Sequence, residues 1–182
     1  MRKITSMLGL LVVSMVWLLA PPAQAADIIL NNTRTQVLFS PNGGCTEAII
    51  KEIDKARNEI LVQAYSFTSV PIAKALLDAH KRRVRVSAIL DKSQRKEKYT
   101  SATFLANARI PTFIDDAHAI AHNKVMVIDR ATVITGSFNF TKAAEEKNAE
   151  NLLILYSREL AKLYVDNWEK HRQHSEEYRA RY

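Results

Sequence analysis

The chain has 182 residues, a hydrophobic content of 47%, only 4 Gly and 5 Pro, and a formal net charge of +7 at pH 7. This composition excludes a disordered or collagen-like chain and predicts a folded core of single-domain length. The one cysteine, Cys45, excludes an internal disulfide, and the excess of basic side chains favours polyanionic partners.

The N-terminal stretch has the pattern of a secretory signal. A basic start is followed by an apolar run over residues 8–20 and by a small-x-small triplet, Ala-Gln-Ala, at 23–25. The run is shorter than the roughly 20 residues of a spanning helix and ends at two prolines, so an uncleaved membrane anchor is the weaker alternative. We expect a cleaved signal over residues 1–25 and one domain over residues 26–182, exported to a bacterial periplasm or secreted.

Strand and helix patterns alternate after this signal, without an internal repeat or a low-complexity linker. Runs rich in β-branched residues predict strands, and apolar residues three or four apart predict helices. The expected strands are 35–40, 59–67, 84–90, 111–115, 124–129, 132–137 and 151–156, and the expected helices are 46–57, 70–82, 99–108 and 158–174. Several strands are apolar on both faces, as in sheets covered by helices on both sides. We therefore expect an α/β fold, a single α/β/α sandwich with a mixed central sheet.

One run, AHNKVMVIDRATVITGSFNF, carries a pattern that occurs once in the chain. Its members are His122, Lys124, Asp129, Gly136, Ser137 and Asn139, in the order H-x-K-x4-D-x6-G-S-x-N. A short turn joins the two strands of this run, so the ends that carry the His-Lys pair and the Ser-x-Asn pair lie side by side. Residues i and i+2 share a strand face, so both pairs can point into one pocket. A lysine cation with amide and hydroxyl donors suits the oxygens of a phosphate.

This motif resembles the signature of the phospholipase D superfamily, and in particular its small bacterial endonucleases. The resemblance extends to FSPNGGCTEAIIKEIDKARNEILVQAYSFTS and GSFNFTKAAEEKNAEN, and so covers nearly all of the chain after the signal. It implies a phospholipase D-like fold, phosphodiester chemistry and a mechanism without a metal or other cofactor. Many members carry two copies of the motif in one chain, whereas this chain carries one.

The residue types of the motif suit a covalent mechanism. A neutral imidazole of His122 can attack phosphorus to form a phosphohistidine, while Lys124, Ser137 and Asn139 bind the non-bridging oxygens. The leaving oxygen needs a proton from a group whose pKa lies near the working pH, and no other histidine is followed by lysine two residues later. The missing acid is best supplied by His122 of a second subunit, which predicts a homodimer with the active site on its two-fold axis.

Two further members of the candidate site are carboxylates. Glu150 matches the family's orienting carboxylate and is expected to hold the imidazole of His122; the alternative is a solvated charge next to Glu145 and Glu146. Asp129 belongs to the catalytic motif by position, but its place at the head of a turn favours a structural role in capping turn backbone. Gly136 is expected to allow a close approach of backbone or phosphate.

Basic residues outside the motif are candidates for contact with the DNA backbone. Lys92 and Arg95 belong to a charged run after the strand 84–90, where ligands of α/β sheets usually bind; the alternative is a solvated loop. Arg83 and Arg109 follow two helices at places where a left-handed residue, usually Gly, is needed, so they either cost some stability or extend a DNA-facing rim.

No metal site is expected. The chain has no H-E-x-x-H and no CxxC pair, and His118 stands about 13 Å from His122 in an extended segment. His171 and His174 on the last helix are expected to be solvated. Cys45 is expected to be a small buried residue rather than a reactive thiol.

Together these features predict an exported, metal-independent, sequence-nonspecific endonuclease that cuts DNA, with RNA open as a second substrate. The first alternative is a phospholipase D or cardiolipin hydrolase that acts on a lipid phosphodiester with the same residues. A nucleic-acid-binding module without catalysis is the second, and the intact nucleophile argues against it.

Overall fold

The computed structural model describes residues 26–96 and 100–180 of the chain. Its strands are β1 (Thr35–Ser40), β2 (Glu59–Ala64), β3 (Arg85–Asp91), β4 (Thr112–Asp115), β5 (Lys124–Ile128), β6 (Thr132–Gly136), β7 (Glu150–Tyr156) and β8 (Glu176–Glu177). Its helices are α1 (Cys45–Lys55), α2 (Val70–Lys81), the 3-10 turn η1 (Lys92–Arg95), α3 (Ser101–Asn107), α4 (Lys142–Glu146) and α5 (Arg158–His174). The signal predicted over residues 1–25 lies outside the described residues. None of the helices described is both long enough and apolar enough to cross a membrane.

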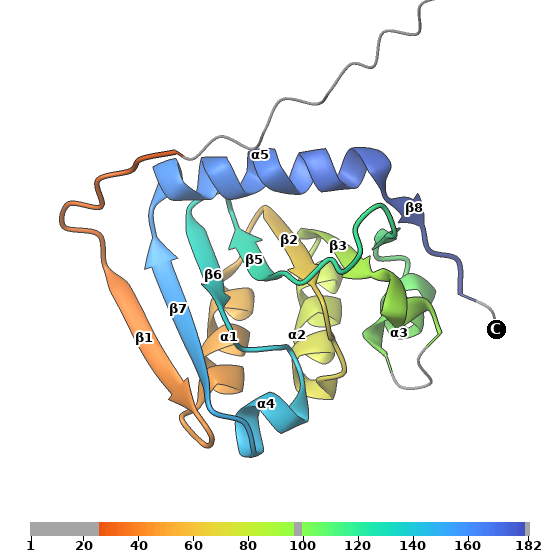
Figure 1. The fold of residues 1–182 in the computed structure, drawn as a ribbon, viewed down its shortest axis with the longest axis horizontal. Coiled ribbons are helices and arrows are strands. Elements are labelled where there is room, and N and C mark those ends of the chain that lie inside the picture. Colours follow the sequence, from red (N-terminus) through yellow and green to blue (C-terminus); the bar gives the residue numbers. More distant parts are fainter. Residues whose placement is uncertain (1–25, 97–99, 181–182) are drawn as a thin grey trace, which may run out of the picture.

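All the strands belong to one mixed sheet in the order β1-β7-β6-β5-β2-β3-β4-β8. β2, β3 and β4 run parallel, and the remaining pairs are antiparallel. α5 crosses one face of the sheet, and α1 and α2 lie behind it (Figure 1). The expected α/β/α sandwich with a mixed sheet is confirmed.

The sheet is apolar on both faces because each face has its own helices. Ile60 and Val62 of β2 pack with α1, α2 and α3, in a cluster that also includes Met126 of β5. Leu61 and Val127 point to the other face and pack with Val165 and Trp168 of α5. The indole nitrogen of Trp168 donates to the Val62 carbonyl oxygen at 2.9 Å, which ties the helix to the middle of the sheet.

Both arginines that follow helices adopt the left-handed backbone conformation predicted for them. The φ angle is +69° at Arg83 and +60° at Arg109. They line one open hollow at the edge where β3 begins, together with Arg85 and Trp168. The motif lies at the opposite end of the strands, as described below, so these two arginines do not border the proposed catalytic residues.

The differences from the predicted elements are small and local. α1 begins one residue early, at Cys45, which is fully buried; burial raises the pKa of its thiol to about 11, in agreement with an unreactive core residue. η1, α4 and β8 were not predicted, because segments of two to five residues are too short to show a hydrophobic period.

Candidate active site

All the motif residues except Asp129 lie at one end of the sheet, where β5 begins and β6 ends. Lys124 pairs with Ala64 at the end of β2, and Gly136 pairs with Leu152 near the start of β7. The start of β7 lies next to α4 in Figure 1. The prediction that the His-Lys end and the Ser-x-Asn end lie side by side is confirmed.

His122 stands exposed just before β5 and is held through its neighbours. The ring centroids of His122 and Tyr65 are 4.5 Å apart and the rings are tilted by 55°. The next residue, Asn123, accepts the backbone N–H of Tyr65 at 2.7 Å and a side-chain N–H of Gln63 at 3.2 Å. The end of β2 therefore fixes the position from which the imidazole projects into solvent.

Lys124 is a buried cation, with 7% of its surface exposed. Its ammonium donates to the His122 carbonyl oxygen at 3.1 Å and lies 5.0 Å from the centre of the Tyr65 ring. Burial lowers the pKa of Lys124, and the nearby charge of Glu150 partly opposes this. Among the described residues no carboxylate forms an ion pair with Lys124. A buried ammonium without a paired anion is suited to binding an anionic ligand.

In the segment from Gly136 to Phe140, two phenylalanines are buried in the core, and the polar side chains next to them are thereby held at the site. Phe138 and Phe140 are fully buried, and Phe67 meets Phe140 edge to face at 5.8 Å between ring centroids. The intervening Asn139 has a buried side-chain oxygen for which no hydrogen-bond donor is found among the described residues. Such an oxygen is a place for a donor that arrives with a ligand or with water.

Ser137 is tied to the first residues of β7. The backbone N–H groups of Ser137 and Phe138 donate to the Asn151 carbonyl oxygen at 3.1 and 3.2 Å, and the Ser137 hydroxyl accepts the Asn151 N–H at 3.0 Å. Gly136 approaches the same carbonyl so closely that an added Cβ would lie 2.2 Å from its oxygen. The close approach expected of this glycine is therefore to backbone.

Glu150 lies at the same edge but is not bonded to the imidazole. Its carboxylate accepts from the Asn148 amide at 3.1 Å, and its backbone N–H donates to the Ser40 hydroxyl at 3.2 Å. Within the described part of the chain no hydrogen bond joins Glu150 to His122.

Asp129 is remote from these residues. It follows the far end of β5, about 17 Å from Lys124 at the usual rise of a strand. Its carboxylate accepts the backbone N–H groups of Arg57, Asn58 and Glu59 at 2.7–2.9 Å. Burial would raise the pKa of Asp129, but these three donors outweigh it and hold the pKa below its ordinary value. Asp129 therefore caps the turn between α1 and β2, in agreement with the structural role favoured from the sequence, and its placement among the catalytic residues is corrected.

Two basic residues of the predicted binding run have partners inside the chain. Lys92 donates to the His118 carbonyl oxygen at 2.9 Å. Arg95 forms ion pairs with Glu176 at 2.8 Å and Asp116 at 3.9 Å. These contacts make Arg95 a weaker candidate for DNA contact than the sequence suggested.

Sequence reasoning missed the residues that support the imidazole, Tyr65 and Asn123. Asn123 stands between His122 and Lys124, and Tyr65 directly follows β2, 57 residues before His122 in the chain. Side chains alternate between the two faces of an extended segment, so Gln63 and Tyr65 at the end of β2 share one face. The sequence did not indicate that this end of β2 lies next to His122.

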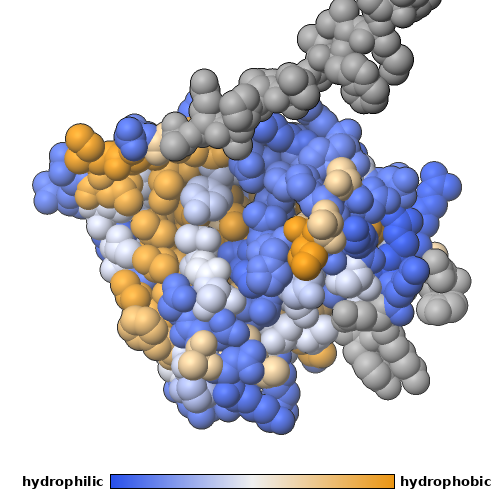
Figure 2. Space-filling view, viewed as in Figure 1, coloured by the Kyte–Doolittle hydropathy of each residue, from blue (hydrophilic) through white to orange (hydrophobic). Residues whose placement is uncertain are grey.

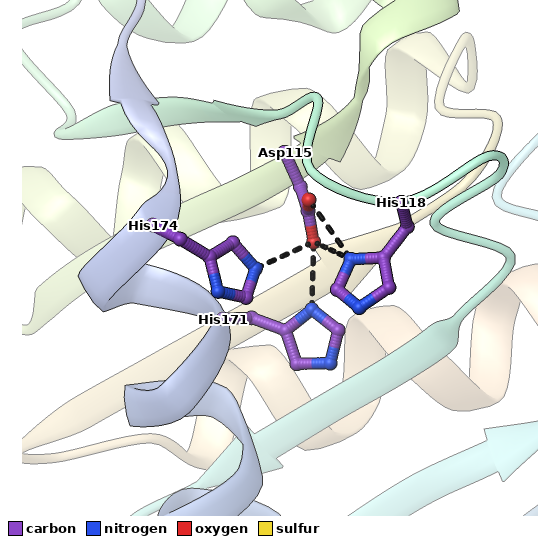
Figure 3. Close-up of side chains that lie close together, drawn as sticks. All are labelled: Asp115, His118, His171 and His174. Atoms are coloured by element: carbon purple, nitrogen blue, oxygen red, sulfur yellow. Dashed lines mark hydrogen bonds and ion pairs between the residues drawn. The ribbon is translucent and has the colours of Figure 1, made fainter. Parts of the chain in front are cut away.

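A second group of polar side chains lies where α5 ends. His171 and His174 were expected to be solvated; His174 is exposed and His171 is half-buried, and both contact the carboxylate of Asp115, which is fully buried (Figure 3). His118 reaches the same carboxylate, and we call these four residues the Asp115 cluster. Burial would raise the pKa of Asp115, but hydrogen bonds from the three imidazoles outweigh it and lower the pKa to about 2.

Comparison with known sequences gives a consistent assignment. The family model described as "Cardiolipin synthase, PLD-like domain" matches residues 49–172. A protein of Rickettsia felis named phospholipase D is 45% identical over 139 residues, which cover 76% of this chain and 70% of that protein. A mitochondrial cardiolipin hydrolase of Xenopus laevis is 30% identical, over 76% of this chain and 70% of its own length.

Comparison with solved structures agrees. Nuc from Salmonella typhimurium, described as a phospholipase D family member, superposes with a TM-score of 0.78 at 37% identity, over 81% of this chain and 99% of Nuc. NucT from Helicobacter pylori superposes with a TM-score of 0.74 over 81% of this chain and all of its own; at 23% identity this likeness concerns the fold.

Proposed function

The chain belongs to the phospholipase D superfamily and is a phosphodiesterase of that superfamily, and from this membership we propose that it is an endonuclease that hydrolyses DNA through a phosphohistidine on His122. The observation that carries the proposal is the meeting of the exposed His122 imidazole with the buried Lys124 cation, which has no ion-pair partner among the described residues. RNA is a second candidate substrate of the same chemistry.

The reaction follows from these positions in two steps. An imidazole nitrogen of His122 attacks phosphorus, a P–N bond forms, and the bond to the leaving oxygen breaks as that oxygen takes a proton. The imidazole that gave this proton, which we assign below to His122 of the partner subunit, is left neutral and then takes a proton from water. The water oxygen displaces the attacking His122 from phosphorus. Lys124 and the side chains of Ser137 and Asn139 stabilise the charge on the non-bridging oxygens in both steps. Tyr65 against the ring and Asn123 next to it in the chain hold the His122 imidazole in position for the attack.

The proton donor is proposed to be His122 of the partner subunit, because the chain carries one motif. Edge strand β1 supplies a surface for this pairing: Val37 and Phe39 are 54% and 67% exposed, and Ser40 at its end pairs with Glu150 of the site. Apolar surface over β1 is visible in Figure 2. A two-fold contact near this strand would bring two copies of the motif edge together and cover apolar residues that are otherwise exposed to water.

Nucleic acid is preferred to lipid as the substrate because of the basic charge of the chain and of Lys92 near the site. A lipid phosphodiester is the second candidate, since relatives are named phospholipase D and mitochondrial cardiolipin hydrolase.

One substrate panel separates these candidates. Purified protein is incubated with plasmid, single-stranded DNA, RNA and cardiolipin vesicles, with and without millimolar EDTA, beside His122→Ala and the control His80→Ala. We expect plasmid to be nicked both in the presence of EDTA and by the His80→Ala control. His122→Ala should abolish nicking while its DNA binding stays close to wild type. Cleavage of vesicle lipid without cleavage of nucleic acid would replace the nuclease by the lipid hydrolase. Inactivation by EDTA with rescue by a divalent cation, seen equally in wild type and in His171→Gln, would refute the metal-free chemistry.

We also propose that the enzyme acts after export, on the basis of the signal pattern in residues 1–25. The N-terminal sequence of the protein recovered from a periplasmic fraction should begin at Ala26. Recovery of the intact chain from the cytoplasm alone would contradict this.

A further inference from the structure

Three imidazoles converge on one carboxylate oxygen in the Asp115 cluster, away from the proposed catalytic residues. Nδ1 of His171 lies 2.7 Å from Asp115 Oδ2, Nδ1 of His118 lies 3.0 Å from it, and Nε2 of His174 lies 3.3 Å from it. Figure 3 shows the three rings pointing at this atom from two segments of the chain. Nδ1 of His118 lies equally close to Oδ1, at 3.0 Å, so the two carboxylate oxygens together receive the three imidazoles.

The spacing of these atoms fits a metal ion. One ligand atom from each of the four side chains lies within 4.8 Å of all the others. Four ligands placed about 2.1 Å from a tetrahedral zinc ion stand roughly 3.4 Å from one another, so small side-chain rotations would bring the cluster to that geometry.

The backbone holds these side chains in place without a ligand. His171 and His174 are three residues apart and so share one face of α5 near its end. β8 follows at once and pairs with β4, Ile114 with Glu176, which fixes the end of α5 beside Asp115. The Arg172 guanidinium lies 3.5 Å from the centre of the Phe113 ring, on the same strand β4.

We propose that the Asp115 cluster is a binding site for a divalent transition-metal ion, with Zn²⁺ as the best fit. Three imidazole nitrogens and one carboxylate oxygen are typical zinc ligands, whereas Mg²⁺ and Ca²⁺ prefer oxygen ligands throughout. Four protein ligands fill a tetrahedron and leave no position for water or substrate, which is the character of a structural site. His122 is not a member, so the site is separate from the phosphodiester chemistry.

The proposed ion would join the end of α5 to the loop that leads to the catalytic histidine. His118 lies four residues before His122, and between them the Ala121 N–H donates to Asp91 at 2.8 Å. Lys92, the next residue after Asp91, donates to the His118 carbonyl oxygen at 2.9 Å. Binding of the metal would therefore stabilise the C-terminal helix and the approach to the active site together, without a part in the reaction.

Zinc binding is measured on purified protein that has been stripped with a chelator and dialysed. Zn²⁺ is titrated in competition with a chromophoric chelator, on wild type and on His171→Gln and His118→Gln. Glutamine keeps an amide N–H for Asp115, and the His118 side chain is 45% exposed, so neither change opens the core. His80→Gln, a histidine outside the cluster, and His122→Gln are the controls.

We expect one equivalent of Zn²⁺ per chain in wild type and in both controls, and at least a 100-fold weaker affinity in the two cluster variants. Co²⁺ in place of Zn²⁺ should give the intense visible absorption of a tetrahedral complex, and Zn²⁺ should raise the melting temperature of wild type but not of the cluster variants. Absence of a stoichiometric site, or equal affinity in wild type and both cluster variants, would overturn the proposal. So would loss of binding in His122→Gln with retention in the cluster variants. None of these readouts depends on nuclease activity.

Discussion

Replacement of Gly136 by alanine tests how the sheet positions the site. The φ angle of this residue is +146°, in a region that is essentially restricted to glycine, and a Cβ would lie 2.2 Å from the Asn151 carbonyl oxygen. Backbone strain of this kind costs about 1–3 kcal/mol. The collision also forces the Asn151 carbonyl away from the N–H groups of Ser137 and Phe138, and each lost hydrogen bond costs about 1 kcal/mol.

The free energy of unfolding should therefore fall by about 3–5 kcal/mol, which for a chain of this size lowers the melting temperature by roughly 6–20 °C. Gly44→Ala is the matched control, because Gly44 also has a positive φ, +76°, but nothing lies within 4 Å of its added Cβ. Strain alone should cost about 1 kcal/mol there.

Both variants are compared by thermal unfolding and by plasmid cleavage at a temperature where both remain folded. Because Gly136 directly precedes Ser137, a shift of its backbone by nearly 1 Å should lower kcat/KM on the order of 100-fold, while Gly44→Ala keeps the wild-type value. Equal melting temperatures for the two variants, or an unchanged kcat/KM in Gly136→Ala, would refute the reasoning.

Three further predictions concern stability and pH. Asp129→Asn should lower the free energy of unfolding at pH 7 by about 1–3 kcal/mol, against no measurable change for the exposed ion-pair residue in Asp166→Asn. Because the pKa of Asp129 is lowered in the folded state, its stabilisation is present above about pH 4 and is lost as the pH falls through the folded pKa, so acid titration of unfolding should bring the two curves together. As the pH is raised, the rate of cleavage should decline before the ordinary lysine pKa of 10.5 is reached, because burial lowers the pKa of Lys124 and the ammonium loses its proton earlier. The residual activity of Lys124→Arg should not show this decline, because a guanidinium keeps its proton. A decline shared by both proteins would assign it to another group. Arg83→Gly should stabilise the fold by about 0.5–1 kcal/mol in denaturant unfolding, because it removes left-handed strain, and a lower stability would contradict that account.

The strands, the long helices and the motif edge could be predicted from the sequence because each depends on local patterns. The pairing of β5 with β6 follows from a short turn, and this pairing places the His-Lys and Ser-x-Asn ends together. The left-handed positions of Arg83 and Arg109 were likewise predictable from their places after helices.

The errors concern contacts between segments far apart in the chain. Asp129 caps turn backbone, as the sequence favoured, but the turn is at Asn58, 71 residues away, and no local pattern indicates that partner. His171 and His174 were assigned to solvent because their partner Asp115 lies 56 residues before the first of them. The H-x-x-H spacing of the pair on a helix was the one local signal for a shared ligand. Only the pairing of β8 with β4 brings these residues together.

The central claim, that His122 attacks at a site shared by two subunits, is tested most directly by a mixed dimer. Differently tagged wild-type and His122→Ala chains are co-expressed, the heterodimer is purified, and its rate of plasmid cleavage is measured after confirming that subunits have not exchanged. A dimer of wild type with His80→Ala is the control. A shared site needs both imidazoles, one to attack and one to protonate the leaving oxygen, so the His122→Ala heterodimer should be nearly inactive while the control keeps the wild-type rate. Half of the wild-type rate, or full activity in a demonstrated monomer, would contradict the shared site and place the acid elsewhere in the chain.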